Sequence, residues 1–151
     1  MSKCLFTLAV TVLAMFGAGS ALADSNAQHL NSGTVIPSGL AVSEIVVAKD
    51  MVFISGMIGV KPLSLDLAEG GIVPETRQTM QNVKMMLEAH GFSLRNITKC
   101  NVYLADLSEY QAFNAAYGEF FEEGKYPART VVGGNKIVAD GRLEMDCIGV
   151  K

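Results

Sequence analysis

Residues 45–54 read IVVAKDMVFI, two near-continuous apolar runs joined by the turn-like pair Lys49-Asp50. Runs of this kind lack the alternation of a half-exposed strand, so they predict a β-hairpin whose strands are covered on both faces. Beyond the hairpin, the periodicity predicts a helix, a strand, a second helix and two closing strands. This order predicts an α+β domain.

The first predicted helix runs from about Pro74, a favourable first-turn residue, to a stop at Gly91. Met80, Val83 and Leu87 form one apolar stripe along it. This stripe is the surface that we expect to pack on the sheet.

The second predicted helix opens at Asp106, where Glu109 stands three positions later, as in a capping box. Five aromatic residues are predicted to face inward, namely Tyr110, Phe113, Tyr117, Phe120 and Phe121. Two helices can cover only one face of a sheet. We therefore expect association with other copies of the chain to bury the second face.

The first 23 residues have the form of a secretory signal peptide. Lys3 precedes an apolar run from Leu5 to Phe16, and small residues end in Ala21-Leu22-Ala23. A membrane anchor is the alternative, but the run is shorter than the roughly 20 residues that span a bilayer. We expect cleavage before Asp24, a periplasmic or secreted protein, and no membrane attachment afterwards.

Residues 24–151 would then form a single domain of 128 residues. Removing Lys3 from the 12 basic side chains leaves 11 against 15 acidic ones, a net charge of −4. Such a surface offers no basic footprint for nucleic acid, so no nucleic-acid partner is expected.

Two cysteines remain after removal of the signal, Cys100 and Cys147, both in apolar strand-like segments. An exported protein meets oxidising conditions, in which the two could pair. Free buried thiols are also common in such segments. Of these alternatives, we expect two buried thiols.

Several other patterns do not support a site. Gly70-Gly71 and Gly133-Gly134 lack the spacing and following lysine of a phosphate-binding loop. His29 and His90 are far apart and have no partners at metal-binding spacing. No metal and no cofactor are expected.

Arg129 lies in the segment KYPARTVV, residues 125–132. A planar guanidinium stays charged and can hold both oxygens of a carboxylate, which a lysine cannot do. Taken alone, an arginine is more often a solvated surface charge. The residues around it and elsewhere in the chain decide its interpretation.

The Pro127-Ala128-Arg129-Thr130 segment resembles the Pro-Ala-Arg-Ser/Thr signature of the YjgF/RidA family of enamine/imine deaminases. Further segments resemble the family in the same order along the chain: residues 51–56 (MVFISG), 76–84 (TRQTMQNVK), 114–121 (NAAYGEFF) and 143–148 (LEMDCI). The resemblance implies an α+β YjgF/RidA (chorismate mutase-like) fold. In that fold a mixed sheet carries two helices on one face, and three chains form a trimeric barrel with ligand clefts between subunits.

The activity that this resemblance implies is hydrolysis of 2-imino or enamine acids, of the 2-iminopropanoate and 2-iminobutanoate type, to 2-oxo acids and ammonia. By resemblance, Arg129 binds the substrate carboxylate, assisted by the backbone N–H of Val131. Glu144 orients or deprotonates the attacking water. The residues that match the rest of the family's pocket are Ser55, Gly56 and Asn114.

The chain departs from the family at Val42, which stands where the family has a pocket tyrosine, and at Met57, where it has a glutamine. Both changes make the cleft more apolar. They are compatible with a larger substrate, with weaker catalysis, or with a non-enzymatic periplasmic protein that binds small carboxylates. A ribonuclease activity, attributed to some relatives, is disfavoured by the acidic surface.

Overall fold

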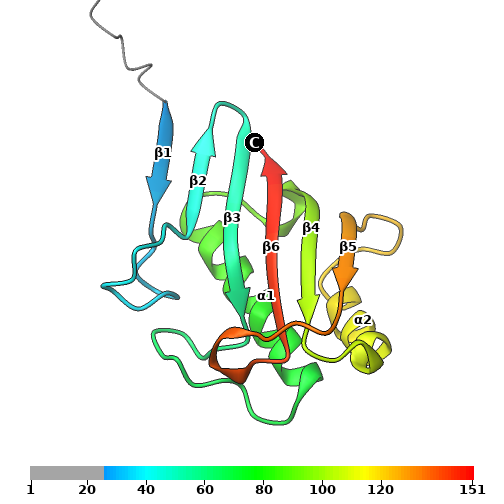
Figure 1. Cartoon of the computed structure of the whole chain (residues 1–151). Helices are drawn as coiled ribbons and strands as arrows, with labels where there is room; N and C mark the ends of the chain where they lie inside the picture. The colour runs from blue at the N-terminus through cyan, green and yellow to red at the C-terminus, as the bar shows by residue number, and fades with distance from the viewer. Residues whose placement is uncertain (1–25) are drawn as a thin grey trace, which may run out of the picture.

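A computed structural model describes residues 26–151 of the chain, so the predicted signal peptide over residues 1–23 lies outside the described residues. The chain forms one mixed sheet with helices on one of its faces (Figure 1). The strands are β1 (Ala27–Leu30), β2 (Ile45–Ala48), β3 (Met51–Ile58), β4 (Ile97–Leu104), β5 (Ala128–Val132) and β6 (Leu143–Val150). The helices are α1 (Ile72–Ala89) and α2 (Tyr110–Gly118), with 3-10 turns at Leu94–Asn96, Leu107–Glu109 and Val138–Asp140.

The strand order is β1-β2-β3-β6-β4-β5, so the last strand of the chain is inserted between β3 and β4. Neighbouring strands are antiparallel except β4 and β5, which are parallel. Both helices lie behind the sheet in the view of Figure 1, so the described residues leave its other face uncovered. The predicted α+β class, with a mixed sheet and two helices on one face, is confirmed.

The predicted hairpin is confirmed as β2 and β3, but the described residues cover only one of its faces, because buried and more exposed side chains alternate along both strands. Ala48 pairs with Met51, so the connection is the two-residue turn Lys49-Asp50, and Lys49 adopts a left-handed conformation (φ 55°). The sheet also contains β1, which was not predicted and which pairs with β2 at one edge. Its four residues include the polar pair Gln28 and His29, so it carries no apolar run.

Helix α1 begins at Ile72, two residues before Pro74, and ends at Ala89. Its predicted stripe is confirmed, since Met80, Val83 and Leu87 are buried in the main core. Gly91 follows the helix with a left-handed φ of 80°, which a residue without a Cβ adopts readily. The stop predicted at Gly91 is confirmed.

Helix α2 starts later than predicted and ends at Gly118, before Phe120 and Phe121. Asp106 caps the 3-10 turn by accepting a hydrogen bond from the Ser108 N–H at 2.8 Å, and α2 starts only at Tyr110. The predicted capping box is wrong because Glu109 pairs instead with Arg142 at 2.6 Å. Phe113 and Tyr117 are buried in the core as predicted, and the half-buried Tyr110, Phe120 and Phe121 pack against it.

The uncovered face of the sheet carries apolar side chains from its central strands. Met51, Phe53 and Val150 are 38%, 40% and 41% exposed, while Val52 between them is fully buried on the helix side. Exposed aromatic and aliphatic side chains grouped on one sheet face are typical of a surface that another chain covers. Within residues 26–151, no helix is long and apolar enough to cross a membrane.

Candidate functional site

Arg129 lies on β5, which is an edge strand of the sheet in one chain. Its Cα pairs with Cys100 of β4, a residue buried on the helix side, so the Arg129 side chain points toward α2. There its Nη2 donates a 2.5 Å hydrogen bond to the Asn114 Oδ1 and makes a longer, 3.4 Å contact with the Tyr110 hydroxyl. Two residues one helical turn apart therefore hold this guanidinium.

Three aromatic rings surround the same guanidinium. Its central carbon lies 4.7 Å from the ring centroid of Tyr117, 5.2 Å from that of Phe113 and 5.9 Å from that of Tyr110. At these distances the ring faces attract the cation. Burial raises the pKa of the Tyr117 hydroxyl to about 12, although the charge of Arg129 opposes the rise. The rings and Asn114 together fix the direction of the Arg129 side chain.

Two open grooves meet at Arg129. One, of about 550 Å³, is bordered by Asn114, Ala115, Tyr117, Gly118, Tyr126 and Pro127. The other, of about 640 Å³, is bordered by Leu107, Ser108, Tyr110, Gln111 and Val131. Within residues 26–151, no acceptor takes a hydrogen bond from Nε or Nη1 of Arg129. These donors are available to a ligand in either groove.

Asn114 was predicted as a pocket residue, and the structure shows how it serves the site: its amide oxygen orients Arg129. Val131 lies two residues after Arg129 on the same face of β5 and borders the second groove. The structure therefore brings Arg129, Asn114 and Val131 together at one edge of the sheet.

Glu144 lies elsewhere, on the uncovered face. It is three residues before Cys147, which points to the helix side, and it pairs with Tyr103 of β4 and Ile58 of β3. Its carboxylate occupies the space beside Gly56, where any Cβ would collide with it. Any side chain at position 56 would displace this carboxylate, so the position of Glu144 requires a glycine there.

Ser55 is on the same face of the sheet as Glu144, and Val42 is in the loop that the Ser55 hydroxyl contacts. The Ser55 hydroxyl donates a 2.6 Å hydrogen bond to the Ser43 carbonyl, which ties β3 to the loop before β2. Val42 is in that loop and is 41% exposed. Since strands are about 4.8 Å apart, β3 and β5 are separated by roughly 14 Å across the sheet. One chain thus divides the predicted residues into an Arg129 group and a Glu144 group.

The loop that carries Val42 is held by a buried carboxylate. Glu44 accepts hydrogen bonds from the N–H groups of Ser32 at 2.6 Å and Ile36 at 3.1 Å, and its own N–H donates to Asn31. Burial acts to raise the pKa of Glu44, but these hydrogen bonds hold it below its ordinary value. The ionised carboxylate therefore strengthens the contacts that hold this loop.

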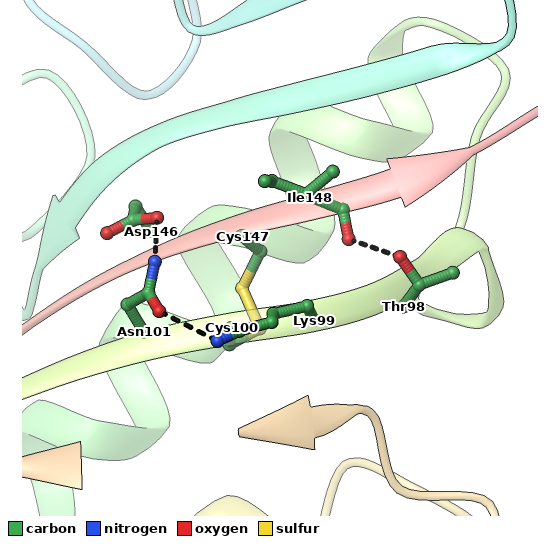
Figure 2. The surroundings of a disulfide bond; sticks show 7 residues. All are labelled: Thr98, Lys99, Cys100, Asn101, Asp146, Cys147 and Ile148. Carbon is green, nitrogen blue, oxygen red and sulfur yellow. Dashed lines mark hydrogen bonds between the residues drawn. A yellow bond between two sulfur atoms is a disulfide. The ribbon is translucent and has the colours of Figure 1, made fainter. Parts of the chain in front are cut away.

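Cys100 and Cys147 form a disulfide, so the expectation of two free thiols was wrong (Figure 2). The two residues are directly opposite each other on β4 and β6, with Cα atoms 4.1 Å apart. Both point to the helix side and are buried. The sequence could not show this, because the pairing depends on the insertion of β6 between β3 and β4.

The polar side chains beside the disulfide lie on the uncovered face. Figure 2 shows Asn101 between two charged neighbours: its amide donates to Asp146 at 3.0 Å, and its oxygen accepts from the Lys99 amine at 3.2 Å. Lys99 also contacts the Thr130 hydroxyl at 3.1 Å. Over residues 26–151, no group of three or more His, Cys, Asp or Glu side chains could hold a metal ion.

Tyr110 is the site residue that sequence analysis assigned to the core. Its spacing of four residues from Asn114 was the available signal, because residues i and i+4 lie on one face of a helix. The sequence could not show that this face is directed toward β5. That direction depends on where α2 starts and on the parallel pairing of β5 with β4.

The family model described as Endoribonuclease L-PSP matches residues 37–151, which is most of the chain. The chain belongs to the Endoribonuclease L-PSP family. One member, the RutC family protein of Pyrococcus horikoshii, is 36% identical over 109 residues, covering 72% of this chain and 86% of that protein. Another, the 2-iminobutanoate/2-iminopropanoate deaminase of Capra hircus, is 33% identical, covering 72% and 79%.

Solved structures of the family share the fold. Escherichia coli TdcF with bound serine aligns with a TM-score of 0.74 at 28% identity, covering 82% of this chain and 98% of that one. The resemblance to YjgF/RidA proteins is therefore confirmed at the level of family and fold.

Proposed function

We propose that this family member hydrolyses small 2-imino acids in clefts that form between copies of the chain. Water adds to the C2 carbon of the protonated imine, and the C2–N bond then breaks. The products are the 2-oxo acid and ammonium, so one water is consumed and no oxidant or reductant is needed. The relatives named as imine deaminases support this reaction class.

The observation that carries the proposal is the state of Arg129. Its guanidinium is fixed by Asn114 and three aromatic rings, yet two of its nitrogens have no acceptor among the described residues. A charged group held in place with free donors is suited to bind a carboxylate. Holding the substrate in one orientation supplies much of what an imine hydrolysis requires.

The second part of the proposed site comes from a neighbouring copy. Glu144 is on the uncovered face, which carries the exposed apolar group Met51, Phe53 and Val150. Covering that face with another chain would bury these side chains and can bring one copy's Glu144 to another copy's Arg129. We propose a homotrimer, the closed assembly that the family resemblance implies, with one site at each interface.

In this site Glu144 would accept a hydrogen bond from the attacking water and direct its lone pair toward C2. Gly56 leaves the room that this carboxylate occupies. The backbone N–H of Val131 is proposed to assist Arg129 in holding the carboxylate. These roles require no bound cofactor.

A non-enzymatic protein that binds small carboxylates is the second candidate. The apolar Val42, in the loop tied to Ser55, favours it, because the loop supplies no hydroxyl of its own at that position. A ribonuclease has less support, because acidic residues outnumber basic ones, 15 to 12.

We propose a periplasmic or secreted location, with cleavage before Asp24. The disulfide between Cys100 and Cys147 supports it, because such bonds persist in oxidising compartments. Intact-mass measurement of periplasmic protein should give a chain that starts at Asp24. A full-length chain in the membrane fraction would contradict this.

The activity is tested with 2-iminopropanoate and 2-iminobutanoate generated in the assay from the corresponding amino acids. The protein should accelerate release of pyruvate and 2-oxobutanoate above the spontaneous rate. If the protein binds the 2-oxo acids but does not accelerate hydrolysis, the enzymatic function is excluded and the carboxylate-binding function stands.

A further inference from the structure

The Tyr110 hydroxyl occupies an unusual position beside Arg129. The Nη2 of Arg129 lies 3.4 Å from the Tyr110 oxygen, a longer contact than its 2.5 Å hydrogen bond to Asn114. In this contact the guanidinium donates and the phenol oxygen accepts. A phenol has one proton of its own, and that proton must be donated to a different group.

Among residues 26–151, no side chain or backbone carbonyl accepts the Tyr110 proton. The hydroxyl is not a buried group closed off from solvent, since Tyr110 borders the open groove that also contains Arg129 and Val131. The rest of the tyrosine is held in place, because its ring packs against the core and lies 5.9 Å from the Arg129 guanidinium. The ring is therefore fixed, and its hydroxyl can donate a hydrogen bond to a ligand beside the Arg129 guanidinium, which also has unused donors.

The wall of the same groove is apolar on the side of the 3-10 turn before α2. Leu107 is 55% exposed there, and its side chain lies over Gly133, where a Cβ would approach the Leu107 Cβ to 2.6 Å. Gly133 thus makes room for Leu107 at the groove. Val131 contributes a second aliphatic side chain.

We propose that Tyr110 is a ligand-binding residue whose hydroxyl donates a hydrogen bond to the carboxylate held by Arg129, with the ligand's aliphatic side chain against Leu107 and Val131. The proposal rests on the proposed function, in that the ligand's carboxylate binds at Arg129. It narrows the ligand to 2-oxo or 2-imino acids with an aliphatic side chain. A ligand with a purely polar side chain would leave Leu107 without an apolar contact.

Calorimetric titration with 2-oxobutanoate tests the hydroxyl. Tyr110→Phe keeps the ring and removes only the oxygen, and it should raise the Kd roughly tenfold or more, as expected for a hydrogen bond to a charged group. Tyr126→Phe distinguishes the two grooves that meet at Arg129, because Tyr126 borders the other groove, is 52% exposed and lies outside the groove proposed for the ligand. Its Kd should equal that of the unmodified protein.

The aliphatic wall is tested by comparing pyruvate with 2-oxopentanoate. Leu107→Ala should reduce the preference for the longer acid severalfold while leaving pyruvate binding close to normal. Equal losses for both acids would overturn the assignment of the wall.

The outcomes separate this proposal from the proposed function. If Tyr110→Phe binds like the unmodified protein while Arg129→Lys binds weakly, Tyr110 is not a ligand donor and the Arg129 site stands. If Arg129→Lys also binds normally, or if the unmodified protein binds no 2-oxo acid, the role of Tyr110 and the proposed function at Arg129 are both overturned.

Discussion

Replacing Arg129 by lysine keeps the positive charge and removes the geometry that the structure builds around it. A lysine amine is a compact charge without a planar face. It cannot reproduce both the 2.5 Å hydrogen bond to Asn114 and the packing of a flat cation within 4.7 Å of the Tyr117 ring and 5.2 Å of the Phe113 ring. We therefore expect the ligand to lose its orientation.

The expected size of the loss follows from the contacts. Losing one charge-assisted hydrogen bond to the ligand costs about 1.5–3 kcal/mol, which corresponds to roughly a tenfold to 150-fold reduction in affinity or in kcat/KM. The stability of the fold should change little, because Arg129 is on an edge strand and only half-buried. Thermal unfolding by circular dichroism checks this separately.

A matched control is available in Arg95→Lys. Arg95 is an exposed arginine whose Nη2 contacts Glu122 at 2.8 Å, and exposed pairs of this kind contribute little. Kinetics and 2-oxo acid binding should be normal in this variant. Arg129→Lys behaving like Arg95→Lys would refute the assignment of the carboxylate site.

Four further outcomes are expected. Reducing the Cys100–Cys147 disulfide, which closes a loop of 47 residues, should lower stability by about 2–4 kcal/mol and the Tm by about 10 °C, measured with and without dithiothreitol. Because the Glu44 pKa is lowered in the folded state, its stabilising effect is fully present above the unfolded pKa of about 4.3 and is lost as the pH falls through the lower folded pKa. Glu44→Gln should flatten the acid limb of the stability profile, and an unchanged limb would exclude this role. Phe53→Glu should convert the assembly to monomers by light scattering, while the same charge placed on the exposed side of α1 should not. Val42→Tyr should raise hydrolysis of the smallest 2-imino acids and lower that of bulkier ones; equal effects on both would place Val42 outside the cleft.

The hairpin and the first helix could be predicted from the sequence because their signals are local. The apolar runs of residues 45–54 and the stripe of Met80, Val83 and Leu87 need no distant partner to be recognised. The start of α2 was mispredicted because Glu109 is used by Arg142, a residue 33 positions away. Local capping rules cannot anticipate that competition.

The residue types of the site could be predicted from the sequence. Their distribution over the two faces of the sheet could not. The segment around Arg129 indicated a carboxylate site, yet the sequence could not place Arg129 and Glu144 on opposite faces. That placement depends on the register of β4 with both β5 and β6. The disulfide escaped prediction for the same reason, since Cys100 and Cys147 meet only through the non-local pairing of β4 with β6.

The central claim is that each site takes Arg129 from one copy and Glu144 from another. It is tested by co-expressing two inactive variants, Arg129→Lys and Glu144→Gln, with different tags and purifying the mixed assemblies. In a closed ring of three copies that contains both variants, one interface of the three combines an intact Arg129 with an intact Glu144, so about a third of full activity should return. Mixed assemblies that remain as inactive as each variant alone would contradict a shared site.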